Sequence, residues 1–184
     1  MSLVFRCCIA LCVAFLAACA AGPTVAPVAP AFDLAGRVAV RFQDRGFSSA
    51  VHWKQNGGSD EIWLTAPLGQ TIAYLQADTA GAMLTAADQK QYRAGSIESL
   101  TRSALGWRFP VAGLRYWVFG QPAPGMALAA VERNDAGRIM RFTQDDWQVA
   151  FVYAATGPAP SRLEMVSSDA NIRFVIDRWT PGPP

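Results

Sequence analysis

The chain has 184 residues, of which 52% are hydrophobic and 16% are charged, and its formal net charge is +2 at pH 7. Globular proteins average about 45–50% apolar and about 25% charged residues, so this composition excludes intrinsic disorder for most of the chain. The balanced charge provides no basic face for nucleic acid. With one histidine, and with all four cysteines in the first 19 residues, the remainder has no multi-histidine metal site, disulfide or cysteine nucleophile. We expect no metal, no cofactor and no nucleic-acid partner.

Residues 1–18 have the pattern of a secretory signal peptide. Arg6 precedes an apolar run that is shorter than the roughly 20 residues needed to span a bilayer. The run ends in Leu16-Ala17-Ala18-Cys19, which resembles a bacterial lipobox and implies cleavage before Cys19 and lipidation of that cysteine. An ordinary signal peptide with an incidental cysteine is the alternative. By analogy with lipoprotein sorting, Ala20 in place of aspartate favours the outer membrane.

Residues 19–31 form a tether rich in proline and alanine. Such segments favour an extended geometry of about 3.1 Å per residue, which holds a domain up to roughly 35 Å from the bilayer. A single domain is expected over residues 32–181.

The predicted domain is mainly β, because apolar and polar residues alternate from Asp33 onward and Asn56-Gly57-Gly58 is a hairpin signal. We count about eleven runs typical of strands, separated mostly by short turns. They cover 33–43, 47–55, 62–64, 71–77, 83–86, 91–93, 126–133, 138–143, 147–154, 162–167 and 172–179. Short strands at this spacing predict an antiparallel meander that forms a barrel or a strongly curved sheet.

Two short helices interrupt the strands between residues 96 and 120. Ser96 is a candidate N-cap and Gly106 a candidate stop for the first helix, while Pro110 opens the second and Gly120 stops it. The expected apolar faces are Ile97, Leu100, Ala104 and Leu105 in the first helix, and Val111, Leu114, Trp117 and Val118 in the second. These helices either cover an open face of the sheet or complete an ordinary core.

No known catalytic motif is present: the chain has no phosphate-binding loop, dinucleotide fingerprint or Gly-x-Ser-x-Gly elbow. His52 lies on the polar face of its strand and is interpreted as a surface residue. Asp145 and Asp146 fall in a hairpin turn, where paired carboxylates are usually solvated; a hydrolase using either one is a minor alternative. We therefore expect no catalytic residue and no enzyme activity.

Several segments together resemble the LolB family of outer-membrane lipoprotein receptors, in the family's order across residues 32–179. They are Phe32-Asp-Leu-Ala-Gly-Arg37, Trp53-Lys-Gln55, Leu64-Thr-Ala-Pro-Leu-Gly69, Leu105-Gly-Trp-Arg-Phe-Pro-Val111, Leu114-Arg-Tyr-Trp-Val-Phe-Gly120, Gln144-Asp-Asp-Trp147 and the strand Ile172–Trp179. The resemblance implies an unclosed antiparallel β-barrel of about eleven strands, with a short helical lid over a hydrophobic cavity. Two departures are aspartate at 146, where the family usually has glycine, and the shortening of an N-terminal helical stretch, which puts the lid's first helix in doubt.

The resemblance also implies a function. Such a protein accepts triacylated lipoproteins from the periplasmic carrier LolA and inserts them into the outer membrane, by passive transfer through the cavity. The expected partners are LolA, the lipoprotein cargo and outer-membrane phospholipid. The protein is expected to be a monomer that is lipid-anchored and faces the periplasm. The alternative is a lipid-anchored structural or adaptor protein without transfer activity.

The candidate site residues fall into two groups. Pro67 and Gly69 predict a tight turn, in which Leu68 either points into solvent or folds back onto the core, and the resemblance assigns Leu68 to a loop that enters the membrane. The candidates for the cavity wall are Val51, Trp53, Leu64, Phe151 and Tyr153, and those for the inner face of the lid are Leu100, Leu105, Leu114 and Trp117.

Overall fold

The computed structural model describes residues 29–182. The predicted signal peptide, Cys19 and most of the predicted tether lie outside the described residues.

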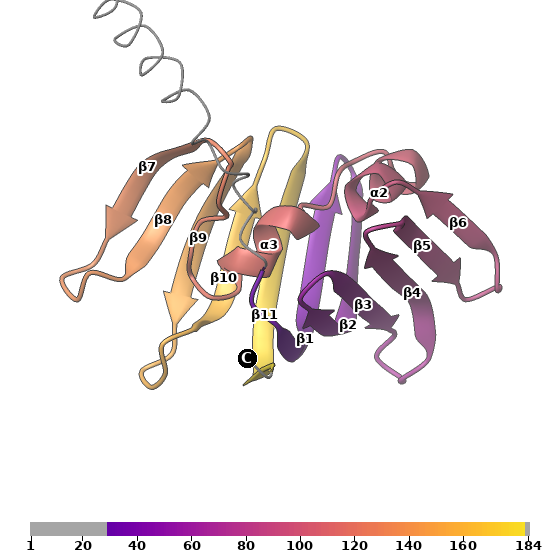
Figure 1. The fold of residues 1–184 in the computed structure, drawn as a ribbon, viewed down its shortest axis with the longest axis horizontal. Helices are drawn as coiled ribbons and strands as arrows, with labels where there is room; N and C mark the ends of the chain where they lie inside the picture. The colour runs from indigo at the N-terminus through magenta and orange to yellow at the C-terminus, as the bar shows by residue number, and fades with distance from the viewer. Residues whose placement is uncertain (1–28, 183–184) are drawn as a thin grey trace, which may run out of the picture.

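Eleven strands form one antiparallel sheet with the order β6-β5-β4-β3-β2-β1-β11-β10-β9-β8-β7. The strands are β1 (Phe32–Phe42), β2 (Arg45–Asn56), β3 (Ser59–Thr65), β4 (Thr71–Asp78), β5 (Gly81–Ala86), β6 (Gln91–Ala94), β7 (Leu128–Arg133), β8 (Ile139–Gln144), β9 (Trp147–Tyr153), β10 (Pro160–Val166) and β11 (Ala170–Pro181). The first and last strands pair at the centre, so β6 and β7 are left as unpaired edges. The sheet curls without closing (Figure 1), which confirms the predicted fold class.

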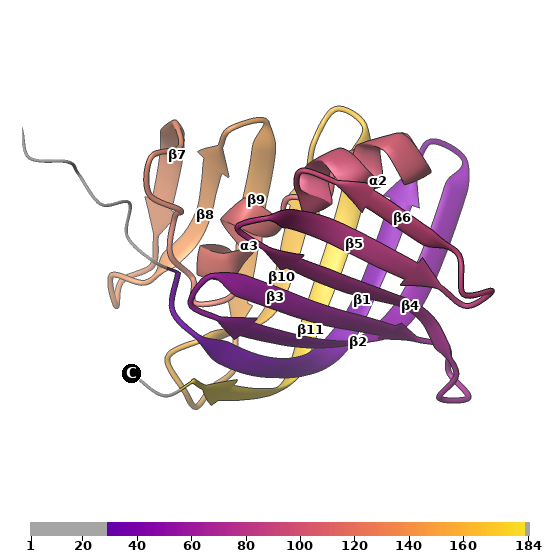
Figure 2. The same cartoon turned by 45° about the vertical axis from the view of Figure 1, so that its right-hand side comes forward.

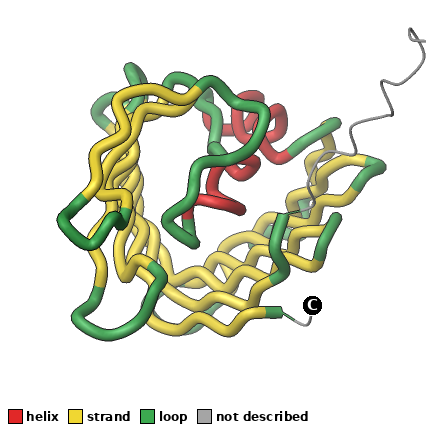
Figure 3. The backbone as a smooth tube through the Cα atoms, turned by 60° about the vertical axis from the view of Figure 1, so that its left-hand side comes forward, coloured by secondary structure: helices red, strands yellow, loops and turns green. Residues whose placement is uncertain are grey.

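The two predicted helices are α2 (Ile97–Leu105) and α3 (Val111–Trp117), and both lie inside the arc of strands (Figure 3). The Ser96 side chain accepts a hydrogen bond from the Ser99 backbone N–H at 3.1 Å, and Gly106 ends α2 with φ +84°. The predicted caps of α2 are therefore confirmed. The second helix ends earlier than expected, at Trp117. Hydrogen bonds between residues three apart, as in a 3₁₀-helix, tighten the chain between Tyr116 and Gly120.

The buried face of α2 also differs from the prediction. Ile97, Leu100 and Thr101 are buried, whereas Ala104 and Leu105 are exposed. The core-facing side of α2 therefore consists of Ile97, Leu100 and Thr101, and the last turn of the helix is exposed.

Close backbone approach explains a glycine in the central strand. At Gly36, where the register between β1 and β11 shifts, an added Cβ would lie 2.1 Å from the backbone oxygen of Val175. No side chain fits in that space, so glycine allows the two central strands to pair through the bulge.

Candidate functional site

A small apolar cavity lies between the α2 region and the concave face of β2 to β5, in the half of the sheet that comes forward in Figure 2. Its volume is about 70 Å³. The lining residues are Val38, Phe47, Val51, Trp53, Ile62, Leu64, Leu75, Leu84, Thr101, Leu105, Trp107, Phe109 and Phe174. The one hydroxyl among them is already engaged, since Thr101 donates to the Glu98 carbonyl and accepts from the Phe109 backbone N–H. Such a wall suits an apolar ligand.

Two partly exposed apolar side chains mark the entrance. Phe47 on β2 is 44% exposed and Leu105 at the end of α2 is 46% exposed, yet both line the cavity. A larger groove of about 410 Å³ lies along β3 to β6, but it is open and bordered by charged residues such as Glu61 and Arg93. The apolar cavity is therefore the better site for a hydrocarbon.

Buried polar bonds fix α3 to the sheet. Asp60 on β3 is fully buried, accepts from Trp53 Nε1 at 2.9 Å, and forms an ion pair with Arg115 of α3. On the other side of α3, Trp117 Nε1 donates to the buried Gln144 side chain at 2.8 Å. Breaking either set leaves buried polar groups without partners, which is costly.

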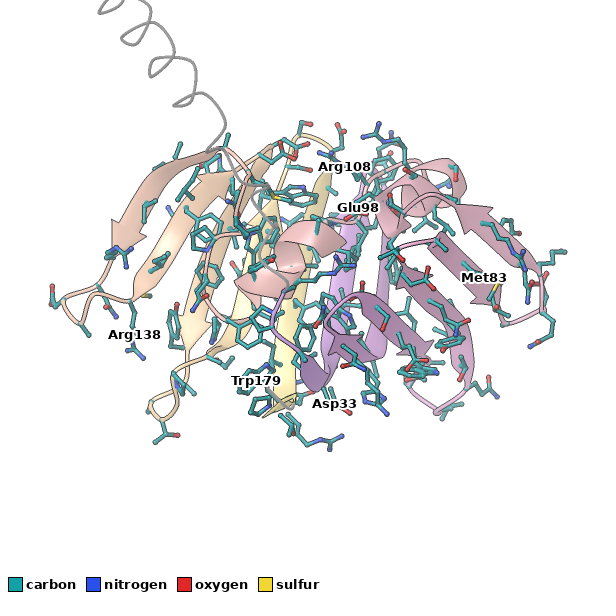
Figure 4. The ribbon with its side chains drawn as sticks, viewed as in Figure 1. Asp33, Met83, Glu98, Arg108, Arg138 and Trp179 are labelled. Carbon is teal, nitrogen blue, oxygen red and sulfur yellow. The ribbon has the colours of Figure 1, made fainter. Side chains whose placement is uncertain are left out.

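The polar attachments of α2 and the loop after it lie nearer the surface. The Glu98 carboxylate accepts from the Ala112 backbone N–H at 2.8 Å, which joins α2 to α3. Arg108 pairs with Asp146 at 2.9 Å and with Asp145 at 3.4 Å, and all three side chains are at least one third exposed. Figure 4 shows Glu98 and Arg108 close to the two helices. Exposed pairs contribute about 0–1 kcal/mol, so the loop that carries Arg108 is the wall of the cavity most easily displaced.

Comparison with known proteins identifies the family. Residues 30–179 match the family model described as Outer membrane lipoprotein LolB. The chain belongs to the LolB family. An outer-membrane lipoprotein LolB from Thiobacillus denitrificans is 36% identical over 157 residues, which cover 85% of this chain and 84% of that protein. Another from Nitrosomonas europaea is 37% identical over 155 residues, which cover 80% and 72% of the two chains.

A solved structure of a LolA superfamily protein from Nitrosomonas europaea aligns with a TM-score of 0.48 at 8% identity, covering 85% of this chain and 88% of that one. Family membership makes the chain an outer-membrane lipoprotein. Among the described residues no helix is long and apolar enough to cross a membrane, and no three acidic, cysteine or histidine side chains are grouped to hold a metal ion.

Within this LolB-family fold, four of the nine residues expected at the cavity or its lid line the cavity: Val51, Trp53, Leu64 and Leu105. Leu100, Leu114, Trp117 and Phe151 do not line it; they are buried in the core with at most 3% exposure. Tyr153 also does not line it, because its hydroxyl donates to the Ile139 carbonyl at 2.8 Å on the other side of α3. The reason is that α3 fills the concave space in front of the C-terminal strands.

Sequence reasoning missed the rest of the wall, which includes Leu75, Leu84, Trp107 and Phe109. Strand pairing could have predicted part of this wall. Trp53 lies opposite Ile62, Ile62 opposite Leu75, and Leu75 opposite Leu84. Residues directly opposite each other share a face of the sheet.

The predicted turn between β3 and β4 places Leu68 at its tip. The Ala66 N–H bonds to the Gln70 carbonyl and the Gly69 N–H to the Ala66 carbonyl, each at 2.8 Å, and Gly69 has φ +83°. Leu68 is 89% exposed, the largest exposure among the described large apolar residues.

The histidine and the paired aspartates, which are not expected to be catalytic, lie near the surface. His52 contacts Asp33 at 2.7 Å and is partly exposed, while Asp145 and Asp146 lie in the β8–β9 turn beside Arg108.

Proposed function

We propose that this protein is a lipoprotein receptor, which accepts triacylated lipoproteins from a periplasmic carrier of the LolA kind and inserts them into the inner leaflet of the outer membrane. The observation that carries the proposal is an apolar cavity on the concave side of an unclosed sheet, in a chain of the LolB family. The activity moves acyl chains between sites and breaks no covalent bond, so it needs no catalytic residue and no cofactor.

The proposed anchor is a lipidated Cys19, formed after removal of residues 1–18, with residues 19–31 as the tether to a domain over 32–181 on the periplasmic side. The start of the domain supports a tether at this point. The Gly182 N–H bonds to the Ala31 carbonyl at 2.8 Å, so the chain is fastened where the domain begins.

The energetics explain why a cavity is needed. Transfer of acyl chains into water costs about 0.8 kcal/mol per CH₂, which sums to tens of kcal/mol for a triacylated cysteine. A protein that shields the chains removes this barrier. Without a nucleotide motif in the sequence, transfer runs downhill, from the carrier to this protein and then to the bilayer.

The cavity must enlarge to hold cargo. Its volume of about 70 Å³ is half that of the roughly 150 Å³ engineered cavity that binds benzene. An acyl chain is longer than benzene, so it enters only when a wall moves. We assign this movement to the loop with Trp107 and Phe109 and the adjoining end of α2 at Leu105, because the ion pairs that hold this loop are exposed, whereas the bonds that hold α3 are buried.

Leu68 is proposed to bring the receptor to the bilayer. Burial of one leucine contributes about 2 kcal/mol, enough to dock the loop without holding it there permanently. Leu64, at the cavity wall, lies four residues before Leu68, so docking of this loop places the cavity beside the membrane.

A reconstituted transfer assay tests the proposal. The mature, lipidated protein is placed in phospholipid vesicles and mixed with a LolA-type carrier loaded with a fluorescent triacylated lipoprotein. We expect label to move into the vesicles much faster than into vesicles without the protein. Label that stays on a functional carrier, with the receptor shown to be folded, would refute the receptor function and favour an adaptor role.

A further inference from the structure

The outer face of β2 to β4 carries a row of stacked aromatic rings. The His52 and Trp63 ring centroids are 5.1 Å apart, those of Trp63 and Tyr74 are 5.0 Å apart, and both pairs are nearly parallel. Lys54 Nζ lies 5.8 Å from the Trp63 ring centroid. His52, Trp63 and Tyr74 are directly opposite one another in the sheet and form what we call the aromatic ladder.

The ladder is outside the cavity. Trp63 lies between Ile62 and Leu64, both of which line the cavity, and successive residues of a strand point to opposite faces. All three ladder residues are only partly buried, although their rings stack together. The ladder therefore contributes nothing to the cavity, and its rings remain available on the convex surface.

The ladder lies next to the Leu68 turn. Trp63 is two residues from the end of β3, or roughly 7 Å along the strand. The β3–β4 connection projects beyond the sheet (Figure 2), and Ile72 at the start of β4 is 43% exposed. One end of the sheet thus has an exposed leucine at its tip, an exposed isoleucine behind it, and the ladder behind that.

The chemistry of the ladder matches the boundary between headgroups and acyl chains. Tryptophan and tyrosine have an apolar body with a polar edge, which suits membrane interfaces. The Tyr74 hydroxyl donates to Glu61 at 2.8 Å, and partial burial together with this bond raises the pKa of Tyr74, so the ring stays neutral. Lys54 lies beside the Trp63 ring and pairs with Asp33 at 4.0 Å, so the charged groups next to the ladder offset one another.

Small residues neighbour the ladder on the side of β1 and toward the Leu68 turn. The outward residue opposite His52 on β1 is Ala35, and the residue opposite Thr65 on β2 is Ala50. No long side chain stands at these two positions.

We propose that the aromatic ladder is a second membrane-contact surface, which rests on the phospholipid interface when Leu68 inserts and so orients the cavity toward the bilayer. This inference depends on the proposed docking by Leu68. Interfacial segments bury their apolar face about 5–10 Å deep, and Trp63 lies roughly 7 Å from the end of β3, where the turn begins. The ladder is proposed to contact the phospholipid surface of the membrane. Contact with a protein partner instead is the alternative outcome of the test.

Tryptophan quenching by brominated lipids tests this surface in the mature protein, reconstituted through its own anchor. Of the six tryptophans, only Trp63 and Trp179 are not buried. Trp179 pairs with Leu34 on the concave face and packs edge-on against Phe119 at 5.2 Å. Its indole N–H is buried without a partner, so Trp179→Phe is a structurally mild control.

We expect Trp63→Phe to reduce the fraction of emission quenched by brominated lipid at least twofold, and Trp179→Phe to leave that fraction unchanged. Quenching that is unaffected by Trp63→Phe, or that is lost equally in Trp179→Phe, would overturn the proposal and leave this face to a protein partner. The same vesicles report cargo delivery independently. Quenching of Trp63 without delivery would refute the receptor function alone, and delivery without quenching would refute the membrane surface alone.

Discussion

The buried ion pair between Asp60 and Arg115 predicts a rescue by a second mutation. In Arg115→Met the Asp60 carboxylate stays fully buried and keeps one neutral donor, Trp53 Nε1 at 2.9 Å. Removal of one partner from a buried pair costs about 3–5 kcal/mol. In a domain of this size, each kcal/mol lowers Tm by about 2–4 °C, so Tm falls by roughly 6–20 °C.

Asp60→Asn in the same chain removes the buried charge but keeps an oxygen that accepts from Trp53. The double variant is therefore expected to regain at least half of the stability lost in Arg115→Met. Thermal unfolding of the wild type, both single variants and the double variant, followed by circular dichroism, measures this. Additive losses in the double variant, or a wild-type Tm for Arg115→Met, would refute the account of how α3 is held.

The same double variant separates movement of α2 from movement of α3. If α3 stays in place while cargo enters, the rate of cargo acceptance is the same in the wild type and in the double variant. Faster acceptance in the double variant would show that the Asp60–Arg115 pair must break during each transfer.

Three further predictions concern single residues. Leu68→Glu is expected to keep the fold and cargo acceptance but to lower delivery to vesicles severalfold. The control is Val152→Glu, which alters an exposed apolar residue on β9 and is expected to leave delivery unchanged. Equal delivery by both variants would contradict the role of the loop. Gln144→Ala leaves the Trp117 indole N–H and a backbone N–H buried without partners, so unfolding measurements should show a loss of about 3 kcal/mol, and an unchanged Tm would contradict it. Gly36→Ala places a methyl group against the neighbouring strand and is expected to cost more than the usual 1–3 kcal/mol of overpacking, which thermal unfolding checks against Gly58→Ala, an open position.

Local patterns were sufficient to predict the strands and helices. Alternation of apolar residues, the Asn56-Gly57 turn and the Ser96 and Gly106 caps each depend on a few neighbouring residues, and the structure has strands and helices where those patterns predict them. The tight turn at Leu68 also follows locally, because a proline and a glycine lie on either side of it, whereas its exposure follows only from the resemblance to the family.

The composition of the cavity wall was harder to predict because it depends on long-range packing. Asp60 lies in a polar hairpin, Ser59-Asp60-Glu61, and nothing near it in the sequence indicates that Arg115 buries it from 55 residues away. Likewise, Gln144 becomes a core residue only because Trp117 and Ala123 meet it there. These contacts hold α3 in the core in front of the C-terminal strands, which helical periodicity alone leaves open.

The central claim is that acyl chains of the cargo occupy the cavity beneath α2. A photo-activated benzophenone amino acid at Leu84, on the cavity wall, tests it directly when the protein receives a triacylated lipoprotein with labelled acyl chains from its carrier. The same probe at Val152, which is exposed on the outer face of β9, is the control. The account predicts cross-links to labelled acyl chains at position 84 and not at position 152. Equal cross-linking at both positions, or none at position 84 during active transfer, would contradict it.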